Sequence, residues 1–257
     1  VIVGAIVDPR SPRTSLLYVL RVWAWETWTS LRAFSWRQPF AAGFPELAVT
    51  RDPDRPAVLL IHGYVCNRAA WARLLASNEL AGCNVATVNL EPAFASIDAY
   101  ADVVHGAVET LRAASGAAQV TLVCHSMGGL AARAYLRKYG DGAVIKIVTI
   151  CTPHHGTVFG LLGHGRNARE MARGSAFLRD LAASESAALR SKFVCIASRD
   201  DNLIVPRSSP ILPGAKAVWL EGTGHLAMIE DPRVWAVVRQ EVFERTAAEK
   251  PAPALTA

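Results

Sequence analysis

Long apolar runs are missing from this sequence. The apolar stretch VIVGAIV at residues 1–7 is far shorter than the roughly 20 residues that a transmembrane helix needs. We therefore expect neither a complete membrane span nor a complete signal peptide, and the stretch fits at most the end of a longer anchor that has been trimmed. The cellular location stays open between the cytoplasm and a membrane surface.

Lysine is also scarce. Only five of the 27 basic residues are lysine, and the 22 acidic residues leave a net charge of +5. The basic residues are scattered and form no continuous block, so we expect no nucleic-acid partner. The charge favours mild attraction to anionic surfaces, although a generally arginine-rich composition is the simpler explanation.

Cysteine is sparse as well. The five cysteines are an odd number without short spacings, which argues against a disulfide framework and against a zinc site. Cys124, Cys151 and Cys195 fall within or at the ends of apolar segments and fit buried free thiols. Cys66 and Cys83 lie in predicted loops, and the sequence leaves open whether they pair.

Apolar residues, in contrast, make up 51% of the chain and charged residues 19%, so the chain can bury a large core. From residue 56 onward, apolar segments alternate with helical ones, which indicates a mostly parallel sheet with helices on both faces. Residues 156–191 interrupt this alternation. The predicted strands are 57–63, 84–90, 119–126, 143–151, 192–198 and 215–221, and the predicted helices include 68–81, 96–115, 127–139 and 232–244.

The N-terminal residues are rich in tryptophan. Four of the seven tryptophans lie in the first 40 residues, where the apolar spacing predicts a helix. We expect residues 1–50 to form a helical extension, 51–247 the main domain and 248–257 a flexible tail. Because tryptophan favours membrane interfaces, the helix either makes peripheral membrane contact or packs on the main domain.

Ser126 stands in TLVCHSMGGLAARAY, between a buried strand and a helix. A sharp turn there would force Ser126 to a positive φ angle and project its hydroxyl, and the close approach of strand and helix needs small residues at Cys124 and Gly128. Chemistry gathers at the carboxyl ends of parallel strands, so we interpret Ser126 as a nucleophile rather than a helix cap. The N–H of Met127, at the helix start, is a candidate oxyanion donor.

A serine nucleophile needs a base and an orienting acid. His225 lies in EGTGHLAM, directly after the last predicted strand, and is preferred over the histidines within residues 154–164. The acid should follow another strand. The strand KFVCIAS is followed by both Asp200 and Asp201, and this spacing does not choose between them.

The segments LLIHGY, VCHSMGG, TPHHGT, SRDDNLIVP and GTGHLAM together resemble the α/β-hydrolase superfamily, in particular its bacterial serine esterases and lipases. The resemblance covers about residues 56–245. It departs from the family's G-x-S-x-G motif at Cys124. It implies an α/β-hydrolase fold, with a mostly parallel central sheet, helices on both faces, and a helical cap or lid insertion at about 156–191 after the sixth strand.

The same resemblance assigns roles to residues. It favours Asp201 over Asp200 as the acid, and the order Ser126, Asp201, His225 matches the family's chain order. It also implies that the Tyr64 N–H, in the short His-Gly-x form, is the second oxyanion donor.

The insertion suggests an apolar substrate. We expect Phe159, Leu161 and Leu162, together with Leu226, to contact an acyl chain. The alternative is a surface helix that buries its own apolar stripe.

The resemblance implies a carboxylesterase or lipase that hydrolyses uncharged esters through a Ser-His-Asp triad and an acyl-enzyme, with no metal and no organic cofactor. The rival hypotheses are an amidase, thioesterase or acyltransferase with the same triad, a cofactor-free haloperoxidase, and a non-catalytic, membrane-tethered binding module. The sequence leaves the acyl chain length and the oligomeric state open.

Overall fold

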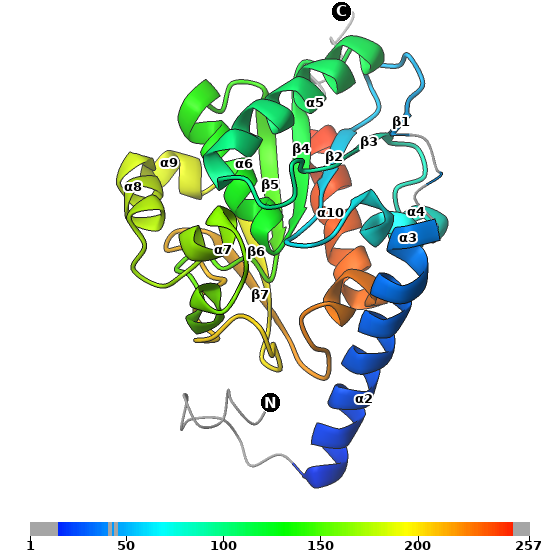
Figure 1. Ribbon diagram of the computed structural model, residues 1–257. Helices are drawn as coiled ribbons and strands as arrows, with labels where there is room; N and C mark the ends of the chain where they lie inside the picture. Colours follow the sequence, from blue (N-terminus) through cyan, green and yellow to red (C-terminus); the bar gives the residue numbers. More distant parts are fainter. Residues whose placement is uncertain (1–14, 41–42, 44–45, 249–257) are drawn as a thin grey trace, which may run out of the picture.

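A seven-stranded sheet in the order β1-β3-β2-β4-β5-β6-β7 forms the centre of the molecule (Figure 1). The structure, a computed structural model, describes residues 15–40, 43 and 46–248. All neighbouring strands run parallel except β1, which pairs antiparallel with β3. The strands are β1 (Leu47–Ala48), β2 (Ala57–Ile61), β3 (Asn84–Val88), β4 (Val120–His125), β5 (Val144–Ile150), β6 (Phe193–Ser198) and β7 (Lys216–Leu220).

Helices cover both faces of the sheet, as predicted. Alternate strand residues such as Leu59 and Leu122 face α5, α6 and α8, whereas Leu60 and Val123 face α4 and α10. Because both faces are covered, β2, β3, β4 and β6 are buried at every position. The helices on the two faces are α4 (Ala72–Ala76), α5 (Tyr100–Ser115), α6 (Met127–Tyr139), α8 (Ala176–Ser184) and α10 (Pro232–Ala248). The short helices η2 (Arg68–Trp71), η3 (Ile97–Ala99) and η5 (Ala227–Glu230) directly precede α4, α5 and α10.

Most element boundaries differ from the sequence-based expectation by a few residues, and two differences are larger. The predicted helix at 68–81 is shorter, because Asn78 has a positive φ of 64° and ends the helical path after α4. Strand β1 has two residues, too few for a periodic signal, and it pairs with β3. The sheet therefore begins before residue 51, inside the segment predicted to be an extension.

The insertion lies between β5 and β6, so it follows the fifth strand and not the sixth. The expectation counted one strand too many, because five strands, β1 to β5, precede the insertion in the described part of the chain. The insertion contains η4 (Val158–Leu161), α7 (Arg166–Glu170), α8 and α9 (Ala187–Arg190).

The second half of the insertion is packed into the body. Phe177, Leu178 and Leu181 of α8 are buried in the core cluster that includes α6. Nε of Arg133 lies 2.6 Å from a carboxylate oxygen of Glu185, and both side chains are buried. This half matches a helix that buries its own stripe.

The N-terminal helix α2 (Leu16–Arg32) packs along the edge of the main domain (Figure 1). It continues into η1 (Ala33–Arg37), a π-helical turn, and α3 (Gln38–Phe40). Its buried residues are Val22, Glu26 and Thr29. A buried ion pair between Arg37 and Glu230 of η5 holds the far end. Helix α2 thus packs on the main domain, but only with the side that carries these buried residues.

Other expectations fall on the remaining parts of the chain. None of the helices within the described ranges combines the length and apolar character needed to cross a membrane. Cys66 and Cys83 are both free. The stretch at 1–7 and the predicted tail beyond Ala248 lie outside the described residues.

Candidate active site

Ser126 occupies the turn between β4 and α6, and its backbone has φ 52° and ψ −124°, a conformation that residues other than glycine rarely adopt. The predicted positive φ is confirmed. A Cβ on Gly128 would lie 2.5 Å from the carbonyl oxygen of His62, so only glycine lets the start of α6 approach the end of β2. Cys124 is fully buried in β4, and its thiol takes the place where the motif normally has glycine. The turn therefore holds the Ser126 hydroxyl at the carboxyl edge of the sheet.

His225 and Asp201 meet Ser126 at this edge, and each follows a different strand. Nε2 of His225 lies 3.0 Å from Oγ of Ser126, and Nδ1 of His225 lies 2.9 Å from Oδ2 of Asp201. All three side chains are buried. Since a carboxylate only accepts, Nδ1 carries the proton, and the lone pair on Nε2 accepts the Ser126 hydroxyl.

The charges of this pair support each other. Burial alone would lower the pKa of His225, but the negative charge of Asp201 and its hydrogen bond outweigh burial and raise that pKa above 6.5. Burial alone would raise the pKa of Asp201, yet the charge of His225, its hydrogen bond and the N–H groups of Leu203 and Ile204 hold that pKa below its usual value. The site therefore favours a charged carboxylate beside a basic imidazole.

The two adjacent aspartates have different partners. Oδ1 of Asp201 accepts the N–H groups of Leu203 and Ile204, each at 2.8 Å, which leaves Oδ2 for His225. Oδ2 of Asp200 instead accepts the Tyr18 hydroxyl of α2 at 2.5 Å and the Gly222 N–H at 2.7 Å. Asp201 is thus the carboxylate that contacts the imidazole, and Asp200 joins α2 to the loop after β7.

The backbone around His225 is held from several sides. Its N–H donates to Oδ1 of Asn202 at 3.1 Å, and its carbonyl oxygen accepts Nε2–H of His125 at 3.2 Å. Burial lowers the pKa of His125 to about 3, and the nearby His225 adds to the effect. His125 is therefore neutral and stabilises the loop through its hydrogen bond to the His225 carbonyl oxygen.

Glu26 of α2 provides a further support, which sequence reasoning missed. Its two carboxylate oxygens accept the N–H groups of Leu226 and Ala227, each at 2.8 Å. A Cβ on Gly224 would lie 2.7 Å from the Glu26 carboxyl group, so the loop needs glycine there. The available signal was that Glu26 is the single acidic residue of the stretch 15–40, within a mostly apolar helix.

Two backbone N–H groups beside Ser126 are free to donate a hydrogen bond. Within the described part of the chain, neither the Met127 nor the Tyr64 N–H has a hydrogen-bond acceptor. His62 shapes the turn before Tyr64, because its Nε2 accepts the Leu90 N–H at 3.0 Å and its Nδ1–H donates to the Gly63 carbonyl oxygen at 2.8 Å. Burial lowers the pKa of His62 to about 4, so it is neutral.

A cavity of about 400 Å³ opens onto Ser126 and His225. Phe159 and Leu226 line it as expected, but Leu161 and Leu162 do not, because they are 75% and 81% exposed at the solvent side of η4. The Tyr64 hydroxyl donates to the His164 carbonyl oxygen at 2.7 Å and thereby ties the insertion to the turn after β2. The remaining apolar and polar lining includes Ser30, Phe34, Thr157, Met171, Asn202, Leu203 and Ile204.

A larger groove, of about 820 Å³, runs between α2 and the residues that follow β7. Its lining includes Tyr18, Trp25, Trp28 and Arg233, but neither Ser126 nor His225. The smaller cavity is therefore the one that reaches the hydrogen-bonded Ser126–His225 pair.

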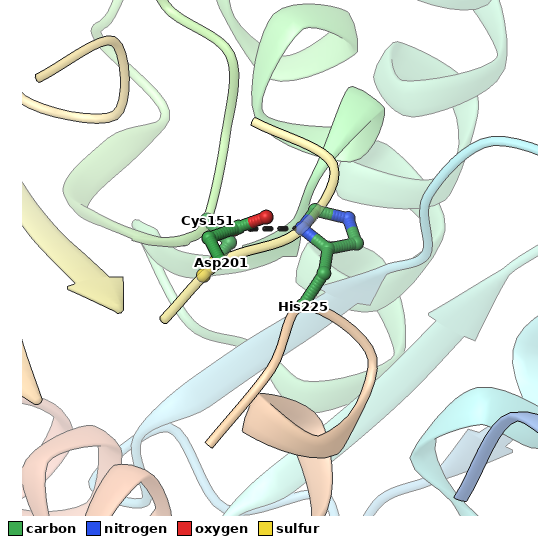
Figure 2. A group of neighbouring side chains, drawn as sticks. All are labelled: Cys151, Asp201 and His225. Carbon is green, nitrogen blue, oxygen red and sulfur yellow. Dashed lines mark hydrogen bonds and ion pairs between the residues drawn. The ribbon is translucent and has the colours of Figure 1, made fainter. Parts of the chain in front are cut away.

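Cys151, Asp201 and His225 form a compact group whose donor atoms lie within 4.8 Å of one another (Figure 2). Such side chains can ligate a metal. Here, however, Asp201 already accepts hydrogen bonds on both oxygens, and burial, with the nearby charge of Asp201, raises the pKa of the Cys151 thiol well above its usual value. The group fits a hydrogen-bonded acid–imidazole pair next to a neutral thiol better than it fits a cation site.

The other candidate histidines are engaged elsewhere. Nε2 of His154 lies 3.1 Å from Oγ1 of Thr149, and Nε2–H of His155 donates to the Ile211 carbonyl oxygen at 3.0 Å. The His164 ring packs edge-on against Phe94, with ring centroids 5.1 Å apart.

Comparisons with known proteins agree with this architecture. A family model described as the alpha/beta hydrolase fold matches residues 56–162. Lipase BlEst2 of Bacillus licheniformis in its mature form is similar, with 18% identity, a TM-score of 0.64, and coverage of 73% of this chain and 92% of the lipase. Esterase RhEst1 of Rhodococcus sp. ECU1013 has 18% identity and a TM-score of 0.53, covering 76% and 93% of the two chains.

Lipase B of Aspergillus fumigatus is 20% identical with a TM-score of 0.62, and the match covers 77% of this chain but 54% of the fungal one. At these levels of identity the likeness concerns the fold. With its mostly parallel, helix-flanked sheet and the family match over 56–162, the chain has the alpha/beta hydrolase fold.

Proposed function

We propose that the protein is a serine carboxylic-ester hydrolase that acts on uncharged esters with apolar acyl chains. The observation that carries the proposal is the continuous contact from Oγ of Ser126 to Nε2 of His225 at 3.0 Å, and from Nδ1 to Asp201 at 2.9 Å. A nucleophile, a base and an orienting acid within hydrogen-bond reach of one another are what acyl transfer needs.

In the first half of the reaction, Nε2 of His225 takes the hydroxyl proton as Oγ of Ser126 attacks the ester carbonyl carbon. The carbonyl oxygen gains negative charge, which the free N–H groups of Met127 and Tyr64 stabilise. His225 then returns the proton to the leaving alkoxide, the alcohol departs, and an acyl group remains bonded to Ser126.

In the second half, a water molecule replaces the alcohol. His225 takes a proton from the water as its oxygen attacks the acyl carbon, and then returns that proton to Oγ of Ser126 as the carboxylic acid leaves. Asp201 stays ionised throughout and stabilises the protonated imidazole.

The cavity supports the choice of substrate. Its wall beside Ser126 includes Phe34, Phe159, Met171 and Leu226, which suit an apolar acyl chain. Its volume of about 400 Å³ lies near the lower end of the roughly 300–1,000 Å³ typical of small-molecule sites. We therefore expect short and medium acyl chains to be hydrolysed faster than long ones.

The test compares Ser126→Ala with the wild type on p-nitrophenyl esters from acetate to palmitate. We expect kcat/KM to fall by at least ~10³-fold, because the alanine cannot form the acyl-enzyme. Ser115→Ala is a matched control, since Ser115 is a buried serine in α5 and its hydroxyl donates to Leu111, outside the cavity. It should keep most of the activity.

Anilides, thioesters and alcohol acceptors in the same assay separate an amidase, a thioesterase or an acyltransferase from an esterase. A fluorophosphonate probe should label the wild type and not Ser126→Ala. If Ser126→Ala keeps most of the esterase activity, or if the probe does not label the wild type, the proposed mechanism is wrong.

A further inference from the structure

Exposed apolar side chains are concentrated on the N-terminal helix. Among the described residues, most of the large apolar side chains that remain exposed belong to residues 16–40. Leu17 is 77% exposed, Leu20 49% and Leu31 56%. A large contiguous apolar patch on the surface of a folded protein commonly marks a site of interaction with another protein or a membrane.

Helix geometry places these side chains on one side. Each residue turns an α-helix by about 100°, so Val22, Glu26 and Thr29, which are buried, share the side that faces the main domain. The opposite side, which we call the outward face of α2, carries the exposed Leu16, Leu17, Leu20 and Leu31 together with the half-buried Thr27. Ala24 and Trp28 lie between this face and the groove, which they line. A helix packed on a soluble body normally presents polar side chains outward, and α2 reverses this pattern.

The exposed or half-buried charged residues of α2 are positive. Helix α2 has three charged residues, Arg21, Glu26 and Arg32, and Glu26 is buried against the loop after His225. Arg21 is exposed, and the guanidinium of Arg32 lies 5.7 Å from the centre of the Trp28 ring. An apolar face bordered by tryptophan and arginine matches the boundary between lipid tails and anionic headgroups.

We propose that the outward face of α2 docks on an anionic lipid surface. A second copy of the chain fits less well, because a two-fold interface would place this face against itself and bring Arg21 and Arg32 of both copies together, while the single carboxylate of α2, Glu26, is buried. Figure 1 shows α2 along the edge of the molecule, with one side away from the main domain.

Docking would place the cavity mouth at the lipid. Ser30 and Phe34, near the end of α2, line the cavity that opens onto Ser126. An apolar ester dissolved in the lipid would then enter beside Phe34. This consequence rests on the proposed function, whereas the docking itself does not.

The experiment is flotation of the full chain with vesicles of phosphatidylcholine, with and without phosphatidylglycerol. The wild type should bind, more tightly with phosphatidylglycerol and less tightly as salt is added. Leu20→Gln with Leu31→Gln should lower the partition coefficient about tenfold or more. Arg21→Gln with Arg32→Gln should lower it about fivefold for each arginine on the anionic vesicles.

Leu161→Gln with Leu162→Gln is the matched control, because these leucines are equally apolar and even more exposed but lie on the insertion. It should bind vesicles as the wild type does, and so should Ser126→Ala, which separates docking from catalysis. A water-soluble short ester should be hydrolysed normally by the α2 variants, which reports that they are folded.

Three results would overturn the proposal: a wild type that does not float, a loss of binding in the insertion pair but not in the α2 pair, or a solution dimer that Leu20→Gln with Leu31→Gln converts to a monomer without any vesicle binding.

Discussion

The β4–α6 segment and helix α2 both support the candidate site, but they bury their side chains in opposite ways. Every residue of β4 and most of α6 are buried, and the turn between them holds Ser126. Helix α2 buries three residues and leaves an apolar side outward, yet one of the three, Glu26, accepts two N–H groups next to His225.

This difference shows that the sheet and helix α2 make separate contributions to the candidate site. The residues of the proposed triad follow β4, β6 and β7, whose ends belong to a rigid sheet that is covered on both faces. Helix α2 supports the backbone next to His225 through Glu26, and Ser30 of α2 and Phe34 of η1 form part of the cavity wall. Substitutions in the first group should abolish activity, and substitutions in the second should tune it.

The largest difference is expected between the two adjacent aspartates. Asp201→Asn should lower kcat/KM on the order of 10³–10⁴-fold, because an amide facing Nδ1 favours the tautomer that cannot accept the Ser126 proton. Asp200→Asn should cost less than tenfold, since Asp200 contacts Tyr18 and Gly222 instead of the imidazole. Steady-state kinetics on one short ester measures both, and the reverse ranking would move the acid to Asp200.

The pH dependence of the wild type should show one acid limb from His225. The imidazole accepts a proton only when neutral, so kcat/KM falls about tenfold per pH unit below its pKa. The charge of Asp201 raises this pKa above 6.5 against the opposite effect of burial, so the limb should have its midpoint above 6.5. Rates from about pH 5 to about pH 9 test this. A midpoint below 6.5 would mean that burial prevails over Asp201.

The smallest effect tests whether α2 acts on the base. Glu26→Gln removes a negative charge that raises the pKa of His225, so the acid limb should move to lower pH, with less than a tenfold loss of kcat/KM. Glu170→Gln is the control, because Glu170 also accepts a backbone N–H, from Ile97, but on α7. If Glu26→Gln leaves the limb in place, Glu26 supports the loop without influencing the proton.

Much of the body could be predicted because its signals are local. A buried strand such as 120–125 is visible in the sequence as an apolar run, and Gly128 shortly after Ser126 indicates a tight turn. The strand ends then bring Asp201 and His225 to the same edge as Ser126. The choice between Asp200 and Asp201 needed the family resemblance, because neighbouring residues share the same local pattern.

The contribution of α2 could not be predicted, because it depends on contacts between distant parts of the chain. Glu26 and Leu226 are separated by 200 residues in sequence, and no periodicity links them. The exposure of Leu161 and Leu162 was equally hidden, since a short apolar segment does not indicate which of its side chains turns toward a cavity.

By itself, the sequence determined the alternation of strands and helices, the strained turn at Ser126 and the chain order of its partners, since these follow from backbone sterics and apolar periodicity. Only the tertiary structure decided which leucines reach the cavity and that an N-terminal carboxylate supports the loop after β7, and it placed Asp201, which the family resemblance favoured, against His225. Those outcomes depend on how separately formed elements pack, and packing selects among side chains whose local patterns are equivalent.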